Sequence, residues 1–404
     1  MKVKPEIQKT CEHFLYPPSR DEDKDFLKMY DPSGAHKIAT HYGFIPCKIP
    51  SIKKNPIIVQ EFEQLNLSKS RNSNYISPIQ KAVHIKSVCD CGIHKLQLPL
   101  LTHYFEKRFN RLSLDVIGTA KPIAEAILIK VAYEILKENG RKNLVLHINS
   151  VGDRDSLQRF GRELSQFYRK KLSYLHPECI DMLKQDVFSL FSCPNKSCVT
   201  LRETAPKSMN FLSENSREHF KEVLEFMEML EMPYEIDNNL VGNRAISNHI
   251  LFEIRGDELP EGGDSPLAVG MRHDSIARRV GIRKDLPSAS VSISLRDKSE
   301  GSTHHISTFK KPLLYFAHLG FEAKLKSLGF IETLRQANIP FYQAFARDKI
   351  SSQMAAAENL HVPFTIIMGY KEAMEGTVIV RNMATREQNV ILLDKLIPYL
   401  RQIL

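Results

Sequence analysis

The chain contains 404 residues, 42% of them hydrophobic and 25% charged, and its formal net charge at pH 7 is +9. This length exceeds what one compact core normally contains, so about two or three domains are expected. The composition is that of a globular protein, and no apolar run approaches the ~20 residues that a membrane helix needs, which excludes a membrane-spanning protein. The excess of Lys and Arg is compatible with a polyanionic partner such as RNA, but it does not establish one.

The first 25 residues are predicted to be a polar N-terminal segment without a targeting signal. Residues 1–16 alternate charged residues with single apolar ones, so they lack the apolar stretch of a secretory signal and the acid-free face of a transit peptide. We therefore expect a cytoplasmic protein. The seven cysteines, an odd number, argue against a disulfide framework and favour metal ligands or free thiols.

Residues 26–309 are predicted to form one domain that mixes helices and strands. Apolar residues at helical spacing predict a helix over residues 26–42, and a short strand follows over residues 44–49. Short β-branched or Leu-rich runs predict further strands, and periodic runs predict amphipathic helices. The strands are expected at residues 112–117, 144–148 and 290–295, and the helices at residues 123–139, 154–171 and 217–230.

From about residue 310 the pattern changes to short strands that alternate with helices, which is typical of an α/β unit. A second domain is therefore predicted over residues 310–404. Its strands are expected at residues 313–318, 341–345, 364–368 and 377–381, and its helices at residues 322–337 and 350–359 and at the end of the chain.

Several ordered segments resemble histidyl-tRNA synthetases, which are class II aminoacyl-tRNA synthetases. Leu240–Glu253 is similar to the family signature L-V-R-G-L-D-Y-Y-T-x-T-V-F-E at both ends, Leu146–Asp153 is similar to I-N-S-x-G-D, and Ala268–Gly281 is similar to G-G-R-Y-D-x-L-x-x-x-x-G. The helix, strand and proline around Tyr42-Gly43-Phe44 resemble the first class II motif, which builds the dimer interface in the family. The resemblance covers roughly residues 26–404.

The resemblance implies an α+β fold. The expected core is a class II antiparallel sheet with helices, carrying an insertion over about residues 154–215, and it is followed by a C-terminal α/β domain like the family's anticodon-binding domain. The resemblance also implies a homodimer, and tRNA or another RNA as partner.

The residues that carry the chemistry in the family differ here. Activation of histidine with ATP and Mg²⁺ needs cations around the α-phosphate, and arginine suits this task because its planar fork meets two oxygens at once. The first signature has Gly242 where the family has Arg, and Ala245, Ile246 and Ser247 where it has Asp-Tyr-Tyr. Asp297 stands where the family has the ATP-clamping Arg, and no F-R-x-E occurs between His103 and Asp115.

We therefore predict a synthetase-like protein without catalytic residues, which acts as a tRNA- or RNA-binding or regulatory module. The alternative is an active histidine-tRNA ligase, in which Arg272, Arg244, Arg296 or Arg108 compensates for the displaced positions. Arg272 alone matches the family in register, and two interpretations of it stay open: it binds a small anion, or it is an ordinary surface or salt-bridged arginine.

A structural zinc site is predicted in the insertion. His176-x-x-Cys179 and Cys193-x4-Cys198 supply four ligand-type side chains in two short clusters, which is the arrangement that tetrahedral zinc needs. Some members of the family have two cysteine pairs at the corresponding place, so His176 would replace one thiolate. The alternative is four unrelated side chains. Cys89 and Cys91 are expected to be free thiols.

Overall fold

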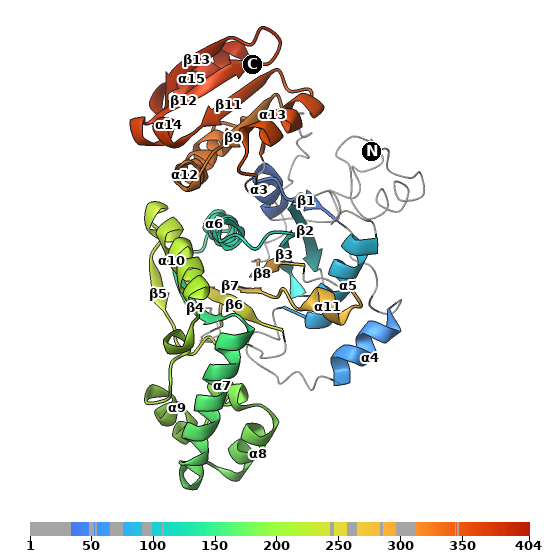
Figure 1. Ribbon diagram of the computed structural model, residues 1–404, viewed down its shortest axis with the longest axis vertical. Helices are drawn as coiled ribbons and strands as arrows, with labels where there is room; N and C mark the ends of the chain where they lie inside the picture. The colour runs from blue at the N-terminus through green and yellow to red at the C-terminus, as the bar shows by residue number, and fades with distance from the viewer. Residues whose placement is uncertain are drawn as a thin grey trace.

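The computed structural model describes residues 34–47, 52, 55–64, 76–90, 99–106, 109–242, 246–256, 265–282, 286–295, 312–343, 345 and 347–404. No helix within these ranges is long and apolar enough to cross a membrane. The described elements form two sheets with helices packed on them (Figure 1).

The larger sheet has eight strands in the order β1-β2-β3-β8-β7-β6-β4-β5. The six inner strands β2, β3, β8, β7, β6 and β4 each run antiparallel to their neighbours in this group. The edge strands β1 and β5 are parallel to β2 and β4. This arrangement confirms the antiparallel core that the resemblance implies. The strands span β1 Ile45–Pro46, β2 Leu100–Glu106, β3 Arg111–Ile117, β4 Val145–Gly152, β5 Tyr234–Ile236, β6 Asn248–Arg255, β7 Ala268–Arg272 and β8 Ser288–Ser294.

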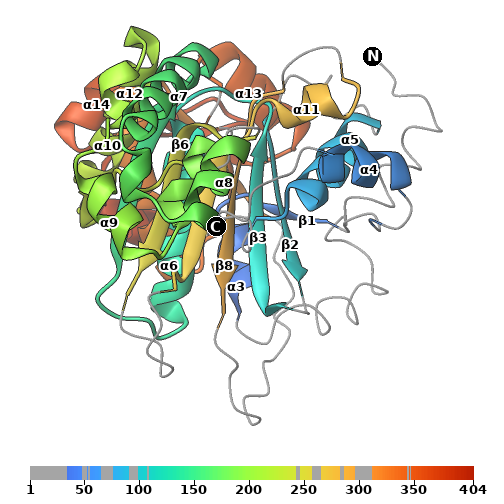
Figure 2. The same ribbon diagram turned by 90° about the horizontal axis from the view of Figure 1, so that it is seen from below.

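The two faces of this sheet differ because side chains alternate along each strand. In β8, Ala289, Val291 and Ile293 join the apolar cluster beneath α6, whereas the serines between them point to the opposite face. The apolar face packs on α3 (Ala35–His41), α6 (Ile123–Glu138) and α10 (Glu214–Met229). The opposite, polar face meets α5 (Pro78–Asp90), which lies beside β2 and β3 (Figure 2).

A group of short helices lies between β4 and α10. It contains α7 (Arg154–Arg169), α8 (Pro177–Gln185) and α9 (Lys196–Glu203), with 3₁₀ turns between them. Asp153 caps α7, because its carboxylate accepts a hydrogen bond from the backbone N–H of Ser156 at 2.9 Å. In Figure 1 these helices lie at the end of the molecule opposite the C-terminal sheet.

The C-terminal sheet has five strands in the order β10-β9-β11-β12-β13. The strands β10, β9 and β11 are parallel, and β12 and β13 continue the sheet in antiparallel fashion. Together the two sheets confirm the α+β fold with a C-terminal α/β domain. The elements span β9 Leu314–His318, α12 Phe321–Gln336, β10 Phe341–Gln343, α13 Ile350–Asn359, β11 Phe364–Met368, α14 Tyr370–Glu375, β12 Thr377–Asn382, β13 Gln388–Leu392 and α15 Leu393–Ile403.

Specific polar contacts join the C-terminal domain to the core. The Tyr42 hydroxyl donates to Glu332 Oε2 at 2.8 Å, and the Tyr42 carbonyl accepts from Gln343 Nε2 at 3.2 Å. Arg335 of α12 bridges Glu332 and Glu138, which is the last residue of α6. Helix α12 therefore has a defined position over α3 and α6, as Figure 1 shows.

We predict that Gly270→Ala destabilises the core. A Cβ atom at Gly270 would lie 2.0 Å from the Phe252 ring, which is buried on the neighbouring strand. Overpacking of this kind costs about 1–3 kcal/mol. Urea denaturation should show the loss. The control is Gly329→Ala in α12, where no atom lies within 4 Å, and which should stabilise by up to about 1 kcal/mol. Equal stability of Gly270→Ala and the wild type would contradict the prediction.

Candidate functional site

The polar face of the large sheet is closed by an internal ion pair. Lys81 of α5 places its Nζ 2.7 Å from Asp115 Oδ1 on β3, and both side chains are almost completely buried. The Lys81 ammonium also lies 4.9 Å from the centre of the Tyr104 ring. Burial acts to raise the pKa of Asp115, but Lys81 and His84 outweigh it and hold the pKa below its usual value. The pair is therefore ionised.

Hydrogen bonds extend from this pair along the polar face. Ser290 donates to Asp115, and His273 contacts Ser290 at 2.5 Å through Nε2 and Ser288 at 3.0 Å through Nδ1. His84 Nε2 lies 2.9 Å from Thr102 Oγ1. Burial is the main cause that lowers the pKa of His84 to about 4 and that of His273 to about 3, so both rings are neutral at pH 7. Around β2, β3 and β8 the face thus carries the Lys81–Asp115 pair and neutral polar groups, and further along the same face Arg255 Nη2 lies 2.8 Å from Glu253 Oε2 on β6.

Sequence reasoning missed the Lys81–Asp115 pair, although the chain contains a signal for it. Lys81, Ile85 and Val88 lie at spacing i, i+4 and i+7, so a helical interpretation places Lys81 on the buried stripe of α5. Asp115 likewise stands at a buried position in an otherwise apolar strand. A buried Lys needs a carboxylate partner, and only the fold shows which carboxylate supplies it.

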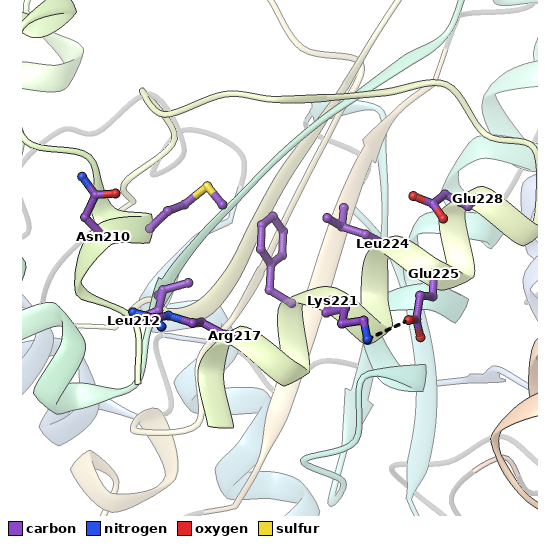
Figure 3. A pocket seen from close by; sticks show the side chains of 9 residues that line it. Asn210, Leu212, Arg217, Lys221, Leu224, Glu225 and Glu228 are labelled. Atoms are coloured by element: carbon purple, nitrogen blue, oxygen red, sulfur yellow. Dashed lines mark ion pairs between the residues drawn. The ribbon is translucent and has the colours of Figure 1, made fainter. Parts of the chain in front are cut away.

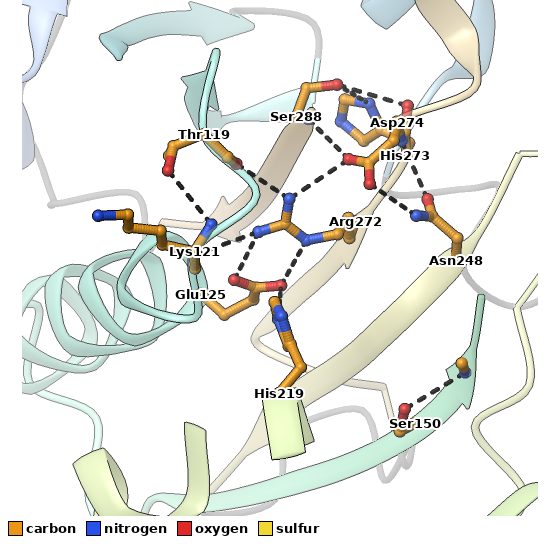
Figure 4. A network of polar contacts seen from close by, with 11 residues as sticks. Thr119, Lys121, Glu125, Ser150, His219, Asn248, Arg272, His273, Asp274 and Ser288 are labelled. Carbon is orange, nitrogen blue, oxygen red and sulfur yellow. Dashed lines mark hydrogen bonds and ion pairs between the residues drawn. The ribbon is translucent and has the colours of Figure 1, made fainter. Parts of the chain in front are cut away.

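Arg272 lies on the other face of the sheet, toward α6 (Figure 4). Its Nε and Nη2 donate to the two carboxylate oxygens of Glu125 at 2.6 and 2.7 Å, and its Nη1 donates to the Thr119 carbonyl at 3.0 Å. Longer contacts reach Asp274 Oδ1 at 3.3 Å and the Lys121 carbonyl at 3.5 Å. Only 1% of its surface is exposed.

Glu125 is the counterion of Arg272 and also contacts His219 Nε2 at 2.9 Å. Burial acts to raise the pKa of Glu125, but Arg272 and His219 outweigh it, so its pKa lies well below the usual range. Every guanidinium nitrogen of Arg272 donates a hydrogen bond to another group of the protein. Of the two interpretations of Arg272, the structure therefore shows the ion pair, and leaves no open position on Arg272 for a small anion.

The first family signature has no room for an arginine at Gly242. This residue has a φ of 63°, and a Cβ atom there would lie 2.3 Å from Leu251 Cδ2 and 2.5 Å from Ser247 Oγ. Ile246 and Ser247 are buried, and the Ser247 hydroxyl donates to Met271 Sδ at 3.3 Å. The segment packs as core. Arg108, Arg244, Ala245, Arg296 and Asp297 lie outside the described residues.

Three of the four predicted zinc ligands lie together. The Sγ atoms of Cys179, Cys193 and Cys198 are within 4.8 Å of one another, and those of Cys179 and Cys193 are 3.6 Å apart. Sulfur ligands of tetrahedral zinc lie about 3.8 Å apart, so the three thiols fit this geometry. His176 does not belong to the group: it is exposed at the N-terminus of α8, where its carbonyl accepts from the Cys179 N–H at 2.9 Å.

An open groove of about 520 Å³ lies between the residues before α10 and α10 itself (Figure 3). Its floor is apolar, and its rim carries both signs of charge, because Lys221 Nζ lies 3.5 Å from Glu225 Oε1. The groove is separate from the polar face. Its lining comprises Met209, Asn210, Leu212, Arg217, Phe220, Lys221, Leu224, Glu225 and Glu228.

Comparisons with known proteins agree with this architecture. Residues 319–403 match the family model described as "Anticodon binding domain". A histidine–tRNA ligase of Fervidobacterium nodosum is 29% identical over 289 residues, which cover 70% of this chain and 67% of that protein. One of Halalkalibacterium halodurans is 27% identical over 302 residues, which cover 73% and 70%. Over about 70% of its length the chain is therefore similar to histidine–tRNA ligases, the proteins of the histidyl-tRNA synthetase family.

A solved structure of the family has also been compared with the chain. The apo S. aureus histidyl-tRNA synthetase matches 95% of this chain and 98% of its own, with a TM-score of 0.48 and 21% identity. In the present chain Arg272 is an internal ion-pair partner, and the space around Gly242 is filled by the side chains of Leu251 and Ser247.

We predict that Arg272→Met costs about 3–5 kcal/mol, because it leaves the Glu125 carboxylate buried without its counterion. Chemical denaturation measures the loss. Arg272→Met combined with Glu125→Gln should recover part of it, because the remaining partner is then uncharged. Arg278→Met on α11 (Ile276–Arg279), an exposed arginine, should change stability by less than about 0.5 kcal/mol. A stable Arg272→Met protein would show that the ion pair is not structural.

Proposed function

We propose that this protein does not activate histidine and that it acts as an RNA-binding module, with tRNA as the RNA. The observation that supports the loss of histidine activation is the bidentate ion pair between Arg272 and Glu125. Activation requires a cation that is free to meet the developing charge on the α-phosphate. A guanidinium that is buried and bonded through all its nitrogens cannot do this without breaking an ion pair inside the protein.

The polar face supports the same proposal. A site for ATP and a carboxylate needs uncompensated positive charge, but the buried cation of this face, Lys81, is neutralised by Asp115 at 2.7 Å. The groups bonded beside this pair are serines and neutral imidazoles, and Arg255 further along the face is itself paired with Glu253. Opening this face to an anionic ligand would cost the separation of a buried salt bridge, which is typically several kcal/mol.

The C-terminal domain supports the RNA-binding half. Its family match is to an anticodon-binding domain, and the relatives reported above are histidine–tRNA ligases. Lys349, Lys371 and Arg381 supply positive charge at the start of α13, on α14 and on β12. Phosphate contacts by such residues give affinity that falls as salt rises. A homodimer built through α3 and β1 is part of the proposal, since these elements correspond to the first class II motif.

A structural zinc ion is also part of the proposal. Cys179, Cys193 and Cys198 would hold it, and rotation of the exposed His176 side chain would supply the fourth ligand. Burial raises the pKa of Cys179 and of Cys198, so the thiols are protonated without metal, and binding must release protons. The ion would join Cys179 of α8 to Cys193 and to Cys198 of α9.

For the main proposal, we expect the purified protein to show no histidine-dependent exchange of pyrophosphate into ATP. We also expect it to bind tRNA with a dissociation constant that rises steeply with salt. Neutralising the three basic residues with Lys349→Gln, Lys371→Gln and Arg381→Gln should weaken binding at least tenfold in a filter-binding assay.

A matched control for this assay is the triple variant Lys137→Gln, Lys142→Gln and Lys184→Gln. It removes the same charge from the core and insertion and should bind tRNA as the wild type does. Histidine-dependent exchange at the rate of an active ligase would overturn the proposed loss of activation. Salt-insensitive absence of tRNA binding would overturn the RNA-binding proposal.

We predict about one zinc ion per chain after purification without chelator. Elemental analysis measures the metal, and cobalt substitution should give the thiolate charge-transfer absorption of a site with three sulfur ligands. Cys193→Ser should lose the metal and lower the melting temperature, whereas Cys89→Ser, at a partly buried cysteine outside the cluster, should retain it. His176→Ala should weaken zinc binding without abolishing it. A metal-free wild type that is as stable as the zinc-loaded one would contradict the site.

A further inference from the structure

The end of β9 in the C-terminal domain carries a histidine with no polar partner. His318 is completely buried, and neither ring nitrogen has a hydrogen-bond partner. Its ring lies 4.7 Å from that of Phe345 and 5.9 Å from that of Phe316. Burial and the nearby Lys324 ammonium lower the pKa of His318 to about 3, so the ring is neutral and presents one donor and one acceptor. Leaving such groups unpaired costs about 1–3 kcal/mol.

His318 lies where open α/β sheets bind ligands. The parallel strands β9, β10 and β11 end at the same edge of the sheet. The helices that follow β9 and β10 pack on opposite faces, because α12 joins the cluster of Leu314 and Phe316, whereas α13 joins that of Tyr315 and Ala317. The crevice at such a reversal is the usual binding position in this class of sheet. Helix α12 begins there, and no side chain caps its first turn.

Two lysines from different domains meet at Asp348, and the charges of Lys324 and Asp348 act on His318. Lys324 of α12 and Lys121, which precedes α6 in the core, both donate to the carboxylate of Asp348. The Lys324 side chain is only 7% exposed, whereas that of Asp348 is 53% exposed. The carboxylate therefore reaches in from the surface and occupies a position between two ammonium groups. It is the type of oxyanion that a ligand could replace without moving the backbone.

We propose that His318, Lys324 and Lys121 form a binding site for a phosphate monoester or inorganic phosphate, and that Asp348 fills this site when no ligand is bound. A phosphate dianion offers acceptors to both lysines, to the first N–H groups of α12 and to the His318 ring, and its charge exceeds that of the carboxylate that it replaces. Glu222 of α10 also acts electrostatically on Lys324, so a bound phosphate must outweigh the charge of this second carboxylate as well.

The location connects the site to both domains. The Lys121 carbonyl accepts a hydrogen bond from Arg272, and the Lys121 ammonium reaches Asp348. A bound phosphate would therefore contact the α12 side of the C-terminal domain and the segment of the core that holds Arg272. The inference does not depend on whether the protein activates histidine or binds tRNA.

Titration calorimetry of the full chain in phosphate-free buffer tests the site, with inorganic phosphate, adenosine 5′-monophosphate and adenosine as probes. Inorganic phosphate and the monophosphate should bind and adenosine should not. Tighter binding of the monophosphate than of inorganic phosphate would assign the natural ligand as an ester. Asp348→Ala should bind about tenfold more tightly, because the competing carboxylate is gone. Lys324→Met should bind at least tenfold more weakly.

Lys326→Met, two residues further along α12 and therefore on the other side of the helix, is the matched control and should bind as the wild type does. If Lys324→Met does not fold, Lys121→Met tests the same prediction from the more exposed lysine. Resonances of ¹⁵N-labelled His318 should shift with phosphate in the wild type. The proposal is overturned if neither the wild type nor Asp348→Ala binds phosphate. It is also overturned if removal of either lysine leaves the affinity unchanged.

Discussion

The bidentate ion pair between Arg272 and Glu125 is the contact on which the arrangement of the molecule depends. It fixes the end of β7 to the first turn of α6, and Arg272 also holds the carbonyls of Thr119 and Lys121. Lys121 then reaches the C-terminal domain through Asp348. A single buried guanidinium thus orders the sheet, the helix that covers it and the segment that meets the second domain. Such a pair is costly to break, because either charge alone would be stranded in the interior.

The same contact bears on the proposed loss of histidine activation. A cation that serves a ligand must be left without a permanent partner, and this costs stability in the free protein. Here each face of the sheet carries a buried ion pair, Lys81 with Asp115 on one and Arg272 with Glu125 on the other. The core keeps its register and its apolar packing, since these depend on the alternation of residues along the strands and not on the ligand.

Local patterns predicted the elements well where one face of a segment is apolar. The alternation from Ser288 to Ser294 and the apolar run of α6 specify a strand and a helix without reference to the rest of the chain. The cysteine spacing predicted a cluster that the structure brings together. By contrast, Arg272 and Glu125 are 147 residues apart, and Lys81 and Asp115 are 34 apart. No local period links such partners, so only the packed sheet shows which charges meet. His176 has the sequence spacing of a zinc ligand but does not lie with the three cysteines, because spacing alone does not fix the direction of a side chain.

The packing around Gly242 has a consequence for any replacement of this glycine by arginine. The backbone there has a positive φ, and the space that a side chain would need is filled by Leu251 and Ser247. Placing an arginine at this position would strain the turn and clash with the packed residues before it could meet any substrate. An arginine at this position would therefore need Leu251 and Ser247 to move or to be replaced as well. A single substitution of Gly242 would strain the packed segment without placing a cation where a ligand could use it.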